Sequence, residues 1–177
     1  MAEAEQYKES LQESLQQVIH LLNRHKLVED LVHKQDMPRH ALVESLVHKQ
    51  NLVELQKKLE SLHPADVAYI LESLPLDQRL IVWDLVKAER DGEILLEVSD
   101  AVRETLIADM DSEEILAATE HLDTDEIADL APDLPREVIQ DVFKSLSPEE
   151  REQLRSAMSY PEETVGALMD LDRKSVV

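Results

Sequence analysis

Apolar residues recur at every twelfth position between residues 62 and 158. The register that begins at Leu62 is apolar at all nine of its members, which at 43% apolar content happens by chance roughly once in two thousand for a chosen phase. A second register begins at Ile70 and is apolar at every member, and a third runs from Leu71 to Phe143 and is apolar at every member except Thr119. Offsets of three and four residues between registers place them on one face of an α-helix. The Leu62 register comprises Leu62, Leu74, Val86, Val98, Met110, Leu122, Leu134, Leu146 and Met158, and the Ile70 register comprises Ile70, Val82, Ile94, Leu106, Ala118, Leu130, Val142 and Leu154.

The residue after each member of the Leu62 register predicts where a helix begins. Its eight occupants are His63, Pro75, Lys87, Ser99, Asp111, Asp123, Pro135 and Ser147. Ser and Asp accept hydrogen bonds from the unpaired N–H groups of a first helical turn, and Pro at the first helical position loses no hydrogen bond. The segment SPEE (residues 147–150) has the pattern of a capping box. Each unit is therefore predicted to be a helix of roughly two to two and a half turns that ends in a tight turn.

Helices this short are unstable in isolation, so neighbouring units must stack to bury a continuous core. The predicted fold class is all-α, a right- or left-winding superhelix of short helices, known as an α-solenoid. Strand signals are almost absent.

The N-terminal part of the chain follows another pattern. Residues 3–25 predict one amphipathic helix. Two near-copies follow, LVEDLVHKQ (Leu27–Gln35) and LVESLVHKQ (Leu42–Gln50), and Met37-Pro38 breaks the helical pattern between them. We therefore predict three parts: N-terminal helices over 1–55, the short-helix repeat over 56–158, and an exit segment over 159–177.

The net charge of the chain excludes several classes of binding partner. Among 177 residues, 39 Asp and Glu face 18 Lys and Arg, giving a formal net charge of −21. A chain this acidic lacks the clustered positive charge that binds nucleic acid or anionic lipid. No apolar stretch is long enough to span a bilayer, so we expect no direct membrane insertion by this chain. Two glycines argue against a phosphate-binding loop, and without cysteine there is neither a disulfide nor a thiolate metal ligand.

The acidic residues are the one feature of the sequence that suggests a specific chemical role, the binding of a divalent cation. Asp125 and Asp129 are four residues apart, hence neighbours on a helix, where like charges destabilise. Carboxylate oxygens suit a hard divalent cation, and Mg²⁺ typically takes one or two of them and keeps several waters. The same residues also fit a solvated acidic surface that keeps a protein soluble. The seven histidines show no metal-ligand spacing, and no nucleophile–base set occurs, so we expect no catalytic residues and no enzyme.

Three segments carry a resemblance to a known family. They are LHPAD (Leu62–Asp66), DTDEIADL (Asp123–Leu130) and, most specifically, the exit SYPEETVGALM (Ser159–Met169). Over roughly residues 20–170 the chain resembles the cytosolic N-terminal domain of MgtE-type magnesium transporters. The resemblance implies a cytoplasmic domain of a bacterial inner-membrane protein, followed in the parent chain by a pair of CBS modules and a transmembrane pore, with the parent a homodimer.

The resemblance also implies a function and its residues. In that family, Mg²⁺ ions bound between this domain and the CBS modules close the pore when cytosolic Mg²⁺ is high. The acidic pair of the family matches Asp125 and Asp129, and Glu93 aligns with another acidic position. A backbone carbonyl ligand would fall at Gly166 or Ala167. The implied cofactor is Mg²⁺.

An alternative function remains open at this point. A similar helical repeat occurs in flagellar rotor switch proteins, which carry a Glu-His-Pro-Gln signature, and this chain matches only its His-Pro at His63-Pro64. On that interpretation the chain would be an α-solenoid that binds other proteins without a divalent cation.

Overall fold

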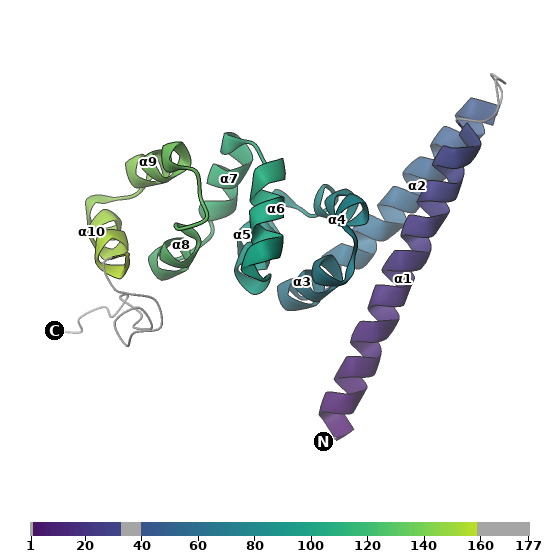
Figure 1. The fold of residues 1–177 in the computed structure, drawn as a ribbon, viewed down its shortest axis with the longest axis horizontal. Coiled ribbons are helices and arrows are strands. Elements are labelled where there is room, and N and C mark those ends of the chain that lie inside the picture. The colour runs from purple at the N-terminus through teal and green to yellow at the C-terminus, as the bar shows by residue number, and fades with distance from the viewer. Residues whose placement is uncertain (1, 33–39, 159–177) are drawn as a thin grey trace. The chain divides into compact units, whose positions relative to one another are not determined.

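A computed structural model of the chain describes residues 2–32 and 40–158. The described residues form ten α-helices and no strand, which confirms the all-α prediction (Figure 1). Two helices are long and the eight that follow are short. Their bounds are α1 Ala2–Val32, α2 His40–Glu60, α3 Pro64–Ser73, α4 Leu76–Trp83, α5 Ala88–Glu97, α6 Asp100–Asp109, α7 Ser112–Thr119, α8 Thr124–Leu130, α9 Arg136–Ser145 and α10 Pro148–Ala157.

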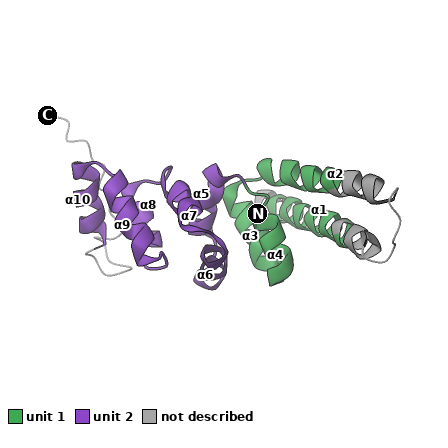
Figure 2. Ribbon diagram, turned by 90° about the horizontal axis from the view of Figure 1, so that it is seen from above, with its two compact units in different colours: residues 1–86 green, residues 87–177 purple. Residues whose placement is uncertain are grey.

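The chain divides into two compact units, residues 1–86 and 87–177 (Figure 2). This division is one of spatial contact, whereas the three parts expected above, 1–55, 56–158 and 159–177, follow the sequence pattern. Those three parts stay a prediction.

In the first unit, α1 and α2 pack side by side, with Val18, Leu22, Leu55 and Leu59 buried on their facing sides. The first LVHKQ-type copy is not a separate helix, because its residues 27–32 form the end of α1, and the second copy lies within α2. The hydroxyl of Tyr7 donates a hydrogen bond to the carboxylate of Asp66, which joins α1 to α3.

In the second unit, helices two apart in the chain stack on each other. The odd-numbered helices α5, α7 and α9 contact in series, and α8 contacts α10. This alternation is the packing expected of a solenoid, in which each repeat mainly touches its neighbours.

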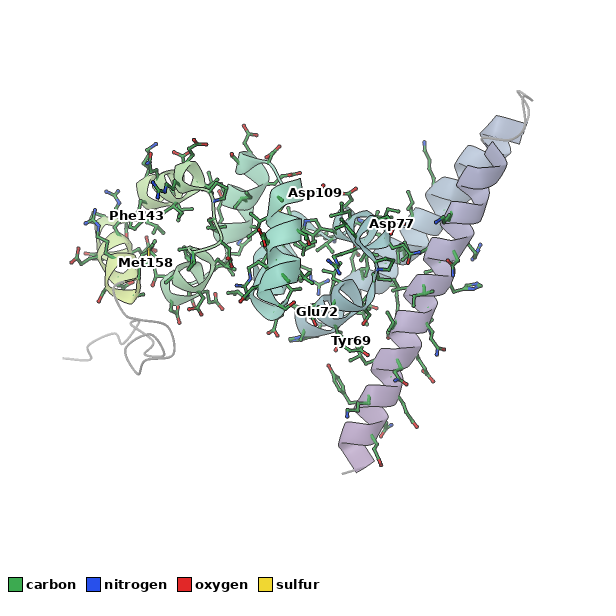
Figure 3. All side chains as sticks on the ribbon, viewed as in Figure 1. Tyr69, Glu72, Asp77, Asp109, Phe143 and Met158 are labelled. Carbon is green, nitrogen blue, oxygen red and sulfur yellow. The ribbon has the colours of Figure 1, made fainter. Side chains whose placement is uncertain are left out.

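The twelve-residue pattern is reflected directly in burial. All eight members of the Ile70 register are buried, none more than 2% exposed. The Leu62 register is buried less completely because its members lie at helix ends, and Met158, at the end of α10, is 43% exposed (Figure 3). In the Leu71 register, Trp83 is buried, whereas Phe143 is half-buried, with the guanidinium of Arg155 5.8 Å from its ring centroid.

The eight positions predicted to begin helices are the eight N-caps of α3 to α10. Ser147 forms the predicted capping box with Glu150. One detail of the prediction is wrong: Pro75 and Pro135 lie at the N-cap and not at the first helical position. The N-cap backbone is extended, at φ −63° for Pro75, which suits the fixed φ of proline equally well.

Gly92 sets the closest approach of α5 to α7. A Cβ added at Gly92 would lie 2.2 Å from the carbonyl oxygen of Ala118, and that oxygen belongs to the backbone of α7, so it cannot turn away. The α5–α7 contact therefore requires the absence of a side chain at this position.

We predict that Gly92→Ala lowers the free energy of unfolding by about 2–4 kcal/mol. The sign of this change distinguishes a close helix contact from an open one, because Gly→Ala inside an unobstructed helix stabilises the helix by about 1 kcal/mol. Urea denaturation followed by circular dichroism measures the change. Glu97→Ala, at an exposed position on the same helix, is the control, and a Gly92→Ala variant as stable as the wild type would contradict the close approach.

Candidate functional site

The acidic pair Asp125 and Asp129 lies on α8, as the sequence predicted. The helix is anchored by Ile127 and Leu130, which are buried, whereas Asp125 is half-buried and Asp129 is exposed. Four-residue spacing on a helix makes the two carboxylates neighbours. The buried apolar face of α8 thus determines the direction in which the carboxylates of Asp125 and Asp129 project.

The electrostatic environment of this pair is unfavourable to two negative charges. Although Asp129 is exposed, partial loss of water around its carboxyl raises its pKa, and the nearby negative charge of Asp125 raises the pKa further. The positive charge of Arg103 acts in the opposite direction on the same pKa, but the net shift is upward. A cation beside the pair would relieve this repulsion.

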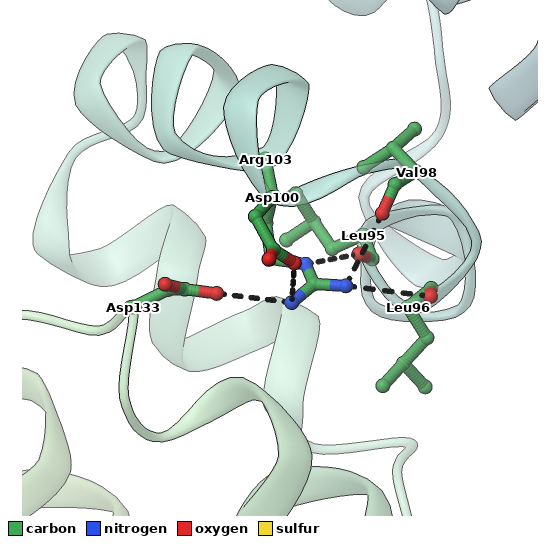
Figure 4. Close-up of polar contacts among 6 residues, drawn as sticks. All are labelled: Leu95, Leu96, Val98, Asp100, Arg103 and Asp133. Carbon is green, nitrogen blue, oxygen red and sulfur yellow. Dashed lines mark hydrogen bonds and ion pairs between the residues drawn. The ribbon is translucent and has the colours of Figure 1, made fainter.

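Arg103, whose charge acts on Asp129, lies on α6, and Figure 4 shows its polar contacts. Its side chain is only 12% exposed. Nε donates to the carbonyl of Leu95 at 2.7 Å, and Nη2 donates to the carbonyl of Val98 at 3.2 Å, so the guanidinium caps the C-terminal end of α5. On its other side, Nη1 donates to Oδ2 of Asp133 at 3.0 Å, in the turn after α8.

The same cap recurs in the chain. Arg79 on α4 donates to the carbonyls of Leu71 and Leu74 at the end of α3, and Arg151 on α10 donates to the carbonyl of Leu146 at the end of α9. Helix C-termini leave carbonyls without intrahelical partners, and the guanidinium fork can satisfy several at once. Arg79, Arg103 and Arg151 are separated by multiples of 24 residues, a signal in the sequence that our pattern analysis missed.

Glu93, the third acidic residue predicted, is exposed on α5. Helix α5 contacts α8, so the helices that carry Glu93 and the acidic pair are packed together. Within residues 2–32 and 40–158, however, no group of three or more His, Asp or Glu side chains could hold a metal ion. Glu93 therefore does not complete a three-ligand site with Asp125 and Asp129, and Gly166 and Ala167 lie outside the described residues.

A second carboxyl near Glu93 was not predicted. Asp91, on α5, is 9% exposed, and its buried Oδ1 has no hydrogen-bond partner. Burial, helped by the negative charge of Glu114 on α7, raises the pKa of Asp91 from 3.8 to about 7. The equivalent positions of the other odd-numbered repeat helices are Val67, Ile115 and Ile139, so Asp91 is a carboxyl in an apolar register.

Among the histidines, His63 has a structural role. It is the N-cap of α3, where its Nδ1 accepts a hydrogen bond from the backbone N–H of Ala65 at 3.3 Å. His33 falls outside the described residues, and nothing is described of the side chains of His25, His40 and His48.

The comparisons with known proteins agree with this architecture. A family model described as the MgtE intracellular N domain matches residues 62–163, which is more than half of the chain. The chain belongs to this family. The match begins at Leu62, the first member of the twelve-residue register.

A solved structure described as the soluble part of a magnesium transporter has a similar fold, with a TM-score of 0.53 and 20% sequence identity. The alignment covers 73% of this chain and 51% of that one, so this chain spans about half the length of its relative. Comparison with curated proteins found no match. In the described part of the chain, no helix combines the length and apolar character that crossing a membrane requires.

We predict that the stability of the wild type falls between pH 5 and pH 8 and that Asp91→Asn removes most of this fall. The carboxyl has a higher pKa folded than unfolded, so the folded state holds the extra proton and loses that advantage as pH rises. The wild type should lose about 1–2 kcal/mol more than the variant over this range, a value reduced because water reaches part of the site. Urea titrations at both pH values measure the difference, and parallel pH curves would contradict the burial of this charge.

Proposed function

We propose that this chain is the Mg²⁺-sensing regulatory domain of a magnesium transporter and has no enzymatic activity. One observation carries the proposal: a chain of the MgtE N-domain family places two mutually repelling carboxylates, Asp125 and Asp129, side by side on a short helix. Oxygen ligands of this kind suit Mg²⁺, which binds through one or two carboxylates and keeps most of its waters.

In this proposal, Asp125 and Asp129 hold hydrated Mg²⁺ from the side of this domain. Glu93 does not join this pair in a three-carboxylate site, so we assign it to a separate Mg²⁺ ion at the surface that faces the partner. The backbone of Gly166 or Ala167 supplies a carbonyl ligand at that surface. The partners are CBS modules and a transmembrane pore domain of the same parent chain, which forms a homodimer at the bacterial inner membrane with this domain on the cytoplasmic side. Mg²⁺ is thus a ligand shared between two docked surfaces.

The charge of the chain explains why such docking would depend on Mg²⁺. A domain with net charge −21 repels another acidic surface, and divalent cations in the gap cancel the repulsion. The ion then binds the docked arrangement more tightly than the separated one, which is the free-energy coupling that a sensor needs. High Mg²⁺ favours docking and a closed pore, whereas low Mg²⁺ releases the domain.

The alternative, an interaction solenoid like those of flagellar rotor switch proteins, depends on His63-Pro64 alone. Those residues begin α3 as an N-cap and a first-turn proline, a local role that any helix start can use. The family match over residues 62–163 favours the transporter domain.

The test is limited proteolysis of the full-length parent protein with and without Mg²⁺. We predict that Mg²⁺ protects the wild type and that Asp125→Asn/Asp129→Asn raises the Mg²⁺ concentration needed for half protection about 10-fold or more, because each missing carboxylate removes a charged ligand.

The matched control is Glu137→Gln/Asp141→Asn on α9, where two exposed acidic residues have the same spacing. It removes the same charge and should leave the protection curve unchanged. Equal shifts in both variants would mean that Mg²⁺ acts through overall charge and would remove the site from Asp125 and Asp129. Protection that never depends on Mg²⁺ would contradict the proposed function as a whole.

A further inference from the structure

Asn51 is a polar residue in the apolar contact between α1 and α2. Asn51, Leu55 and Leu59 follow one another at intervals of four on α2, so they share one face of the helix. All three are buried, at 2%, 1% and 1% exposure. This face packs against α1, where Val18 and Leu22 are buried. On α2, the buried line is therefore apolar except at Asn51.

The amide of Asn51 is not satisfied in this contact. Within the described part of the chain, neither its Oδ1 nor its Nδ2 atom has a hydrogen-bond partner. By contrast, the hydroxyl of Thr119, also buried, donates to the carbonyl of Leu116 at 2.8 Å. An amide that has lost its water and makes no hydrogen bond weakens the packing around it, because the cost of desolvation is not offset.

Separation of the two helices would remove this cost. Water reaches the amide of Asn51 once α2 moves away from α1, and the amide then makes its hydrogen bonds. A leucine at the same position would gain nothing from water and would lose apolar contact. The closed arrangement is therefore less favoured around Asn51 than around Leu55 or Leu59 on the same helix.

The polar contacts of α1 differ between its two ends. Three residues from Asn51 along α2, Glu54 forms an ion pair with Arg24 at 3.7 Å, and each side chain is 45% exposed. An ion pair this exposed adds little to stability. At the other end of α1, Tyr7 donates a hydrogen bond to Asp66 on α3. The N-terminal end of α1 is thus tied to a short helix, whereas the end near Asn51 is held mainly by packing.

We propose that α1 and α2 separate reversibly around Asn51 while α3 stays folded, and that the unpaired amide of Asn51 sets how often this opening occurs. The inference is independent of Mg²⁺ binding. The opening lies before residues 62–163, the part that matches the family model, so those residues keep their packing. In the open state, the pair exposes Val18, Leu22 and Leu55, which the closed state buries. The two helices thus form a conformational switch that exposes an apolar face.

The test is amide hydrogen exchange of this chain, followed residue by residue with nuclear magnetic resonance under conditions where the rate reports the opening equilibrium. In the wild type, we expect the amides of residues 18–26 and 49–56 to exchange about 10-fold or more faster than those of residues 67–71 on α3. Asn51→Leu, which keeps the approximate size of the side chain, should slow exchange in both segments about 10- to 100-fold and leave α3 unchanged.

Asn23→Leu is the matched control. It makes the same chemical change at an exposed position of α1, where water already reaches the amide, so exchange around Asn51 should stay as in the wild type. A further variant, Asn51→Asp, places a charge on the buried face. Because a charge favours the hydrated open state, this variant should speed exchange in the same two segments.

Three results would overturn the inference. Wild-type amides near Asn51 that exchange as slowly as those of α3 would mean that α1 and α2 do not open separately. Equal exchange in the wild type and in Asn51→Leu would mean that the amide does not set the opening. Exchange slowed equally at every helix of Asn51→Leu would mean that the two helices separate only when the whole chain unfolds.

Discussion

Each helix between residues 64 and 157 has only seven to ten residues, too few to be stable alone in water. Stability must come from stacking, and the eight members of the Ile70 register, all buried, are the contacts that provide it. Gly92 shows how strict the stacking is, since α5 meets the backbone of α7 at a point with no room for a methyl group. The positions of the surface carboxylates follow from this packing.

Short helices create a second problem, because every helix end exposes carbonyls that lack partners. Arg79, Arg103 and Arg151 satisfy such carbonyls at the ends of α3, α5 and α9. Arg103, whose side chain is only 12% exposed, also binds the carboxylate of Asp133 in the turn after α8. The end of α5 and the turn after α8 are thereby joined through one side chain.

Much of the fold was predictable because one pattern recurs eight times. The apolar register located the core of the short-helix repeat, and its neighbouring register located the N-caps of α3 to α10, including Lys87, whose side chain gives no local signal. Asp125 and Asp129 were predictable as neighbours because helical spacing alone brings them together. Arg103 with Asp133, 30 residues apart, and Asp91 with Glu114 depend on how helices stack, which periodicity does not contain. Asp91 could have been noticed as the charged member of an apolar register.

The measurement that tests the central claim most directly is paramagnetic broadening by Mn²⁺, which shares the oxygen ligands and octahedral geometry of Mg²⁺. Substoichiometric Mn²⁺ is added to the isotopically labelled chain, and the backbone amide signals are followed. The account predicts that the amides around Asp125 and Asp129 on α8 broaden first and that excess Mg²⁺ restores them. Uniform broadening over all acidic helices, or first broadening at another helix, would contradict it.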